Sequence, residues 1–188
     1  MNFDLLAWLI IAFWIGFRVA LTVSQLKVAL GLGVVVAVAS LVLPSVMPLM
    51  VAILAPFGFL LPALALRDVL GRTWIEIAPF HTLDVILVLI VSTLFIAASI
   101  GVFTVDPYRM GYGPLAPAVV TLVGILWTLW RRHFFILATL LAAQITWTFG
   151  YLSTNFFDLI LHAILVPVCV IWLIKRKLVE ISRHARSV

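Results

Sequence analysis

The chain has 188 residues, of which 65% are hydrophobic and 10% charged, and its mean hydropathy is +1.30. A soluble domain carries roughly 25% charged and about half apolar residues, so this composition excludes an ordinary soluble globule and predicts a helical membrane protein. The net charge of +5 does not indicate nucleic acid as a partner, because the basic residues lie between apolar segments, where membrane topology accounts for them.

Apolar stretches in chain order predict an all-α, polytopic transmembrane helix bundle of about seven spans in a single domain, residues 1–188. Several of them reach the roughly 20 residues that a helix needs to cross a hydrocarbon core of about 30 Å. The second and third are separated only by a short proline-bounded turn, so residues 28–66 either span twice or form a re-entrant hairpin. The expected spans are 4–23, 28–45, 48–66, 82–103, 115–131, 133–150 and 155–174.

The positions of the lysines and arginines predict the orientation of these spans. Cytoplasmic loops near membrane spans are enriched in basic residues, and an external N-terminus with a cytoplasmic C-terminus leaves only Arg109 clearly outside. Arg18 lies near the inner end of the first span, where it can reach the interface or form an ion pair with Asp84. We therefore expect a bacterial-type inner-membrane protein with a basic cytoplasmic tail at 175–188. The other basic residues on the cytoplasmic side are Lys27, Arg67, Arg72, Arg131, Arg132, Lys175, Arg176, Lys177, Arg183 and Arg186.

Residues 67–81, between the third and fourth expected spans, read RDVLGRTWIEIAPFH. Apolar side chains such as Leu70, Trp74 and Ile77 are interleaved with charged ones such as Arg72 and Glu76. This pattern predicts an amphipathic segment on the cytoplasmic surface. Packing at the lipid interface accounts for the pattern, and a platform for a protein partner is the alternative.

The stretch NFFDLILHAILVPV, residues 155–168, places Asp158 and His162 in an otherwise apolar segment. Gln144 lies at a similar depth in the preceding span, and the connection YLST is short enough to make the two spans neighbours. Polar side chains at this depth are costly unless paired, so we expect Asp158, His162 and Gln144 to form one intramembrane polar cluster. Interhelical hydrogen bonds of about 0.6 kcal/mol explain it structurally, and a proton, ion or cofactor site is the functional alternative. Asn155 suits a helix start, and Pro167 predicts a kink.

The longest expected outer loop is TVDPYRMGYGPLAP, residues 104–117. Its turn residues suggest a shaped loop, with Tyr108 and Tyr112 suited to the membrane interface and Asp106 spaced to meet Arg109 within one turn. Such a loop can seal a cavity or contact another subunit, or it can serve only as a connector with aromatic anchors.

Three histidines are candidate cofactor ligands. His81 and His133 are both expected at the cytoplasmic ends of their helices, where they could hold one haem, and His162 could ligate a pigment metal. Cys169 lies two turns beyond His162, about 10 Å along the axis and too far for a nucleophile–base pair. No metal-binding motif is present in the sequence, and no cofactor is strongly indicated.

These features favour an accessory or assembly subunit of a larger membrane complex, with the lipid bilayer and other membrane subunits as partners. One alternative is a small transporter or proton-coupled carrier that uses the expected polar cluster. Another is a haem-binding or pigment-binding membrane protein. No catalytic set of residues is identifiable in the sequence, so an enzymatic activity is not expected.

Overall fold

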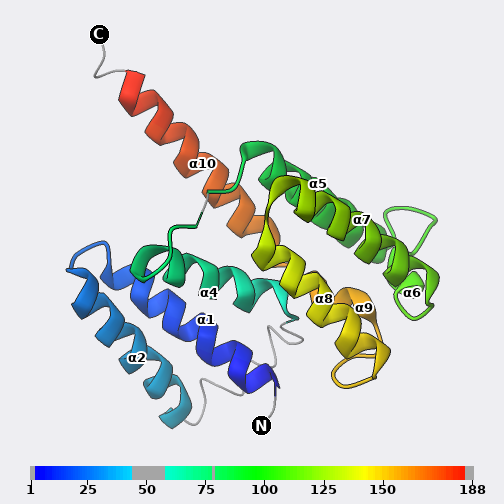
Figure 1. Cartoon of the computed structure of the whole chain (residues 1–188), viewed down its shortest axis with the longest axis horizontal. Coiled ribbons are helices and arrows are strands. Elements are labelled where there is room, and N and C mark those ends of the chain that lie inside the picture. Colours follow the sequence, from blue (N-terminus) through cyan, green and yellow to red (C-terminus); the bar gives the residue numbers. More distant parts are fainter. Residues whose placement is uncertain (1–2, 44–57, 78, 185–188) are drawn as a thin grey trace.

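A computed structural model describes residues 3–43, 58–77 and 79–184 of the chain, and every regular element in these ranges is a helix (Figure 1). The all-α fold class is therefore confirmed. The helices are α1 (Phe3–Ala20), α2 (Leu26–Val42), α4 (Leu60–Thr73), α5 (Thr82–Ser99), α6 (Pro107–Met110), α7 (Leu115–Arg131), α8 (Phe134–Thr148), α9 (Phe156–Ile160) and α10 (Leu165–His184).

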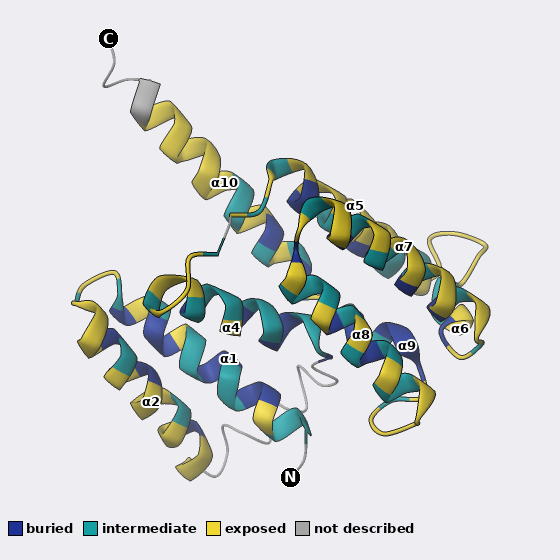
Figure 2. Cartoon of the chain, viewed as in Figure 1, coloured by how far each residue is buried: buried dark blue, intermediate teal, exposed yellow. Residues whose placement is uncertain are grey.

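Three apolar stretches of the described chain are long enough to cross a membrane: Phe3–Ala20, Thr82–Ser99 and Phe156–Ser182, the last of which comprises α9 and most of α10. Three shorter apolar helices, α2, α7 and α8, accompany them. Much of the surface of these helices is exposed, and many of the exposed residues are large and apolar (Figure 2). Exposure of so much apolar surface to water is unfavourable in free energy, whereas contact with lipid chains is not. The fold is therefore that of a membrane protein.

The expected range 48–66 lies in part outside the described residues. Where the structure resumes, α4 continues without interruption from Leu60 to Thr73. The expected surface segment 67–81 is therefore half helix, because residues 67–73 belong to α4, and only its second half is irregular.

Helices α1 and α2 pack closely because glycines let their backbones approach. A Cβ atom added to Gly33 would lie 2.9 Å from the Phe13 ring, and one added to Gly16 would lie 2.8 Å from Val36. Small residues commonly permit such contact between membrane helices, where the hydrophobic effect supplies little attraction.

Helix α1 also packs against α4, and the carboxylate of Asp68 in α4 pairs with two polar side chains of α1. The Trp14 indole donates to Asp68 at 2.9 Å, and Arg18 lies 3.4 Å from the same carboxylate. The expected Arg18–Asp84 ion pair is therefore wrong. Because α4 is the helix that lies against this face of α1, Asp68 is within reach of Arg18, whereas Asp84 is held by residues of α7 and α8.

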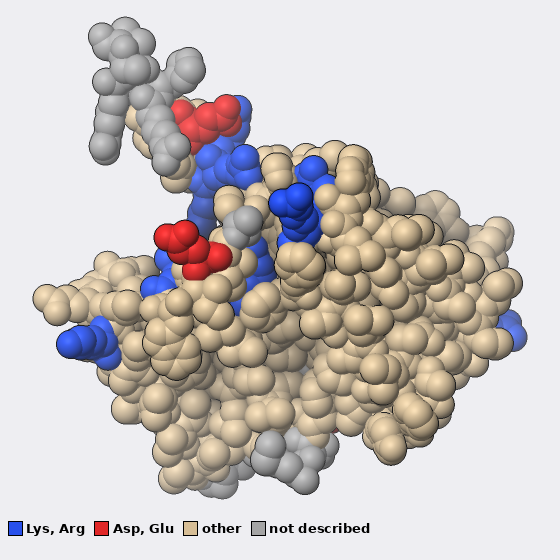
Figure 3. Space-filling model, in the orientation of Figure 1, with Lys and Arg blue, Asp and Glu red and all other residues tan. Residues whose placement is uncertain are grey.

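The second group of helices contains α5, α7, α8, α9 and the first half of α10. Its apolar core includes Ala143 of α8 and the buried side chains Phe156, Phe157, Leu159 and Ile160 of α9. We call the place where α5 begins, α7 ends and α8 begins the Asp84 end, and the place where α6 meets the start of α9 the Tyr108 end. Charged side chains on the face seen in Figure 3 gather mostly where α10 leaves the body.

Candidate functional site

The helix expected over 155–174 is interrupted. Helix α9 ends at Ile160, Leu161 adopts an extended conformation (φ −109°, ψ 142°), and α10 starts at Leu165. Pro167 explains why the helix stops rather than merely kinking. Its ring has no N–H to donate and would clash with the carbonyl of residue 163 in a continuous helix, whereas both defects are harmless in the first turn of a new helix.

His162 lies in this break, which comprises residues 161–164. Its Nδ1 atom accepts a hydrogen bond from the Ile164 backbone N–H at 3.1 Å, and its carbonyl accepts from the Leu165 N–H at 2.9 Å. Because Nδ1 acts as an acceptor, the ring carries its proton on Nε2 in this arrangement. The half-buried imidazole thus accepts a hydrogen bond from one of the backbone N–H groups that the break leaves without a helical partner.

Asp158 precedes the break by one turn and joins α9 to the 104–117 loop. The Tyr108 hydroxyl donates to both carboxylate oxygens at 3.0 Å, and the Ser153 hydroxyl donates to one of them at 2.9 Å. Asn155 caps α9 as expected, accepting from the Phe157 N–H, and its amide also donates to the Tyr108 carbonyl at 2.9 Å. The loop is therefore held on the start of α9 by two polar residues, Asn155 and Asp158, which lie three positions apart at the beginning of that helix.

A partly open cavity of about 110 Å³ lies between α5, α9 and the break. It exceeds the roughly 10–15 Å³ that one water molecule requires. Three polar side chains line it: Ser92, Asp158 and His162. We call it the His162 cavity. The remaining lining residues are Phe95, Ile96, Phe157, Leu161 and Ala163.

Ser92 is the polar residue that sequence reasoning missed. Its side chain is only 2% exposed, and among the described residues its hydroxyl is the buried side-chain polar atom that lacks a hydrogen-bond partner. An unsatisfied buried hydroxyl costs about 1–3 kcal/mol, so a group in the cavity that formed a hydrogen bond to Ser92 would recover that cost. The sequence offers no signal for it, because a lone serine in an apolar helix usually bonds to its own helix backbone.

The expected three-residue cluster is only partly formed. Asp158 and His162 line the same cavity, but Gln144 does not. Gln144 accepts from Thr121 of α7 at 2.8 Å and lies 3.4 Å from the Thr148 hydroxyl one turn away. It faces α7, because the side of α8 that meets α9 is apolar and includes Ala143.

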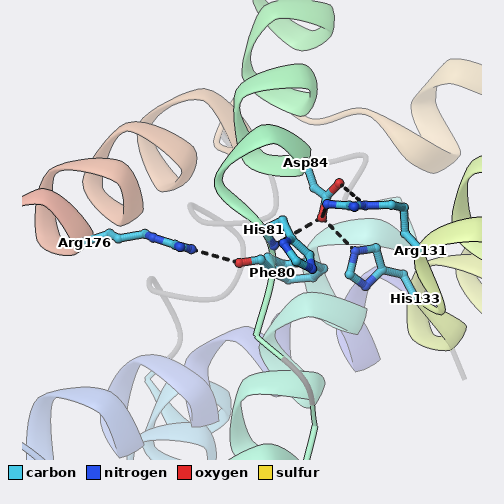
Figure 4. Close-up of polar contacts among 6 residues, drawn as sticks. All are labelled: Phe80, His81, Asp84, Arg131, His133 and Arg176. Carbon is cyan, nitrogen blue, oxygen red and sulfur yellow. Dashed lines mark hydrogen bonds and ion pairs between the residues drawn. The ribbon is translucent and has the colours of Figure 1, made fainter. Parts of the chain in front are cut away.

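A second polar cluster lies at the Asp84 end (Figure 4). The Asp84 side chain is 5% exposed and accepts from Arg131 Nε at 3.1 Å, from His133 Nε2 at 2.9 Å and from the His81 backbone N–H at 3.1 Å. These donors come from the start of α5, the end of α7 and the residue before α8. A buried carboxylate so fully paired is a structural tie between three helix ends.

The two histidines proposed as haem ligands are not a free ligand pair. His133 is buried, and its Nε2 atom is engaged by Asp84. His81 is exposed at the start of α5, where its backbone N–H donates to the Asp84 carboxylate. Within the described ranges, no group of three or more His, Cys, Asp or Glu side chains could hold a metal ion.

In the 104–117 loop, Asp106 caps the short helix α6 by accepting from the Tyr108 N–H at 3.0 Å. It forms no ion pair with Arg109 in the part of the chain that the structure describes, because the cap engages its carboxylate. The Tyr108 and Tyr112 rings pack edge to face with their centroids 5.9 Å apart. Burial and the hydrogen bond to Asp158 raise the pKa of the Tyr108 phenol above its ordinary value.

The site therefore has two parts: a small, partly open pocket with three polar side chains in a mostly apolar wall at a broken helix, and a buried ion-pair cluster at the opposite end of the same helices. Comparison with protein-family models, curated proteins and solved structures finds no match to this chain.

Proposed function

We propose that this chain is a small multi-pass inner-membrane protein that transfers protons or a small cation through the His162 cavity. The observation that supports this proposal best is the coincidence of three features: a broken apolar helix, a cavity at the break lined in part by Asp158 and His162, and the unsatisfied Ser92 hydroxyl in its wall. Secondary transporters place their ion sites at discontinuous helices in this way. The small volume favours a proton, water or a bare cation over an organic solute.

The proposed topology has seven spans with the N-terminus outside and the C-terminus in the cytoplasm, and it rests on the distribution of basic residues. In that orientation the Tyr108 end faces outside. Asp158 is then the cavity residue nearest the outer surface, where the Tyr108 hydroxyl donates to it. A proton that reaches Asp158 passes through cavity water to the imidazole of His162.

Protonation of His162 is linked to the shape of the break. The Nδ1 atom now accepts from the Ile164 N–H, so a proton can bind Nδ1 only when that hydrogen bond breaks. The start of α10 then loses one of its backbone contacts. A change of charge at His162 is thereby converted into movement of the break, which is what a carrier needs to expose its site alternately.

Proton flux into vesicles tests the proposal. The protein is reconstituted with a pH-sensitive dye inside, and a membrane potential is imposed. His162→Leu is expected to lower the flux about a hundredfold, as for loss of a proton-transfer group. Ser92→Ala is expected to lower the flux while keeping or raising thermal stability, because it removes an unsatisfied buried hydroxyl.

Asp106→Asn is the matched control. It removes the charge of an exposed carboxylate in the 104–117 loop, and Asp106 does not line the His162 cavity. It should leave the flux unchanged. If folded His162→Leu protein conducts protons as fast as the unchanged chain, the cavity is not the path and the carrier proposal fails.

An accessory subunit is the second candidate, and the observation that favours it is the outer half of α10. From Lys175 to Ser182 all its side chains are exposed, including the apolar Leu178, Val179 and Ile181, and the helix extends away from the body (Figures 1 and 2). A helix of this length is only marginally stable without packing, so a partner subunit would stabilise it.

Purification in mild detergent, followed by mass spectrometry and an absorption spectrum, tests the second candidate. An accessory subunit is expected to co-purify in fixed stoichiometry with a larger membrane protein. A colourless monomer that supports flux would instead favour the carrier, and visible absorbance would point to a haem or pigment.

A further inference from the structure

Two arginines from helices far apart in the sequence meet at one residue of the Asp84 end. The guanidinium group of Arg67, in α4, lies over the Phe80 ring with its carbon 3.8 Å from the ring centroid. Arg176, in α10, donates to the Phe80 backbone carbonyl at 3.1 Å (Figure 4). Phe80 lies just before α5, so this contact joins three parts of the chain. We call Arg67, Phe80 and Arg176 the Phe80 platform.

Positive charge exceeds negative charge at this platform, because Asp68, the carboxylate next to Arg67, is shared with Arg18 and Arg72. Arg176 contacts the Phe80 carbonyl and lies 5.3 Å from the Trp172 ring centroid, and no carboxylate within the described ranges lies within 4 Å of it. The neighbouring Asp84 is saturated by Arg131, His133 and the His81 backbone. Burial lowers the pKa of the Arg67 guanidinium and Asp68 offsets this only in part, so a further anion beside Arg67 would reduce the remaining cost of its positive charge.

The platform lies at the depth of lipid headgroups. Residues 163–174 of the last apolar segment contain no charged side chain, and Lys175 and Arg176 follow directly. Trp172 lies one turn before Arg176, and the 73%-exposed Trp130 lies at the end of α7, beside the Asp84 cluster. Tryptophans and the first basic residues after an apolar segment mark the membrane–water interface. Figure 3 shows basic side chains, with acidic ones among them, gathered at this level beside a surface that is otherwise nearly free of charge.

We propose that the Phe80 platform binds the phosphate of an anionic phospholipid headgroup from the membrane leaflet at the Asp84 end. Planar guanidinium groups suit phosphate oxygens because they can donate two parallel hydrogen bonds. Basic pockets between membrane helices bind headgroups in the same manner. The lipid, rather than a soluble phosphate, is the ligand because its acyl chains lie along the exposed apolar faces of the helices next to the platform. The proposal is independent of the proposed carrier function.

Lipid retention in the purified full-length chain tests this site. Protein in neutral detergent is titrated with phosphatidylglycerol or with phosphatidylcholine, and bound lipid is counted by native mass spectrometry. We expect phosphatidylglycerol to bind more tightly than phosphatidylcholine. Arg176→Gln should weaken phosphatidylglycerol binding about fivefold, in line with the contribution of one basic residue near an anionic surface. The same substitution should leave the binding of phosphatidylcholine unchanged.

Arg176 is exposed in the outer half of α10, so its substitution should not impair folding. Arg67→Gln provides a second variant with a similar expected loss, and the double variant should lose about 25-fold if the two arginines act additively. Lys27→Gln is the matched control, since it removes the same charge from an exposed position of α2.

Three results would overturn the site. The first is an equal loss in Lys27→Gln and Arg176→Gln, which would mean attraction by net charge alone. The second is equal binding of both lipids. The third is displacement of phosphatidylglycerol by millimolar inorganic phosphate, which would assign the platform to a soluble anion.

Discussion

At the scale of single residues, Tyr108 shows how one hydroxyl can hold a loop against a helix. It donates to both oxygens of Asp158, and Tyr108→Phe is therefore expected to lower the free energy of unfolding by about 1–3 kcal/mol at neutral pH, because a part-buried carboxylate loses one of its two side-chain donors and keeps only Ser153. Thermal unfolding in detergent measures the loss. Tyr151→Phe, which changes an exposed tyrosine, should have little effect.

The raised pKa of Tyr108 adds a pH dependence to this expectation. A group whose pKa is raised by folding contributes stability that is full below its ordinary value, about 10, and is lost as the pH rises through the raised value. The stability gap between the unchanged chain and Tyr108→Phe should therefore narrow in strongly alkaline solution. A gap that stays constant from pH 7 upward would contradict the assigned hydrogen bond.

At the scale of helices, the α1–α2 contact depends on one face of α2. Gly33→Leu is expected to separate the two helices and to cost about 1–3 kcal/mol or more, because its Cβ alone would lie 2.9 Å from Phe13. Gly31→Leu is the control, since nothing lies within 4 Å of a Cβ at that position. Denaturation in the same detergent measures the free energy of unfolding of both variants. Equal stability of Gly33→Leu and Gly31→Leu would show that α1 and α2 are not in close contact.

Local sequence predicted several helix bounds well. The range expected over 115–131 coincides with α7, and that over 82–103 begins with α5 at Thr82, because apolar run length and the residues at helix ends are local properties. The asparagine cap of α9 was predictable for the same reason. The break at 161–164 was not, because a proline in an apolar segment is compatible with either a kink or two helices until the neighbours are known.

At the scale of the whole molecule, the errors concern which helices lie together. Arg18 meets Asp68 rather than Asp84, and Gln144 faces α7 rather than the cavity. Both sets of residues satisfy the same rule, that charged and polar groups in a membrane must be paired. The rule does not choose among partners of similar depth, and the choice follows from the order in which the helices pack.

That order has a consequence for how the chain is assembled during synthesis. Asp84 emerges from the ribosome 47 residues before Arg131 and 49 before His133, and Tyr108 emerges 50 residues before Asp158. Because chains are synthesised from the N-terminus, the Asp84 carboxylate is expected to stay solvated by water or headgroups until its partners have been made. The start of α5 can reach its final packing only after α7 and α8 have entered the bilayer. The last third of the sequence thus supplies the partners of Asp84 and Tyr108, which are synthesised well before it. A chain truncated before residue 131 would leave Asp84 without its two side-chain donors.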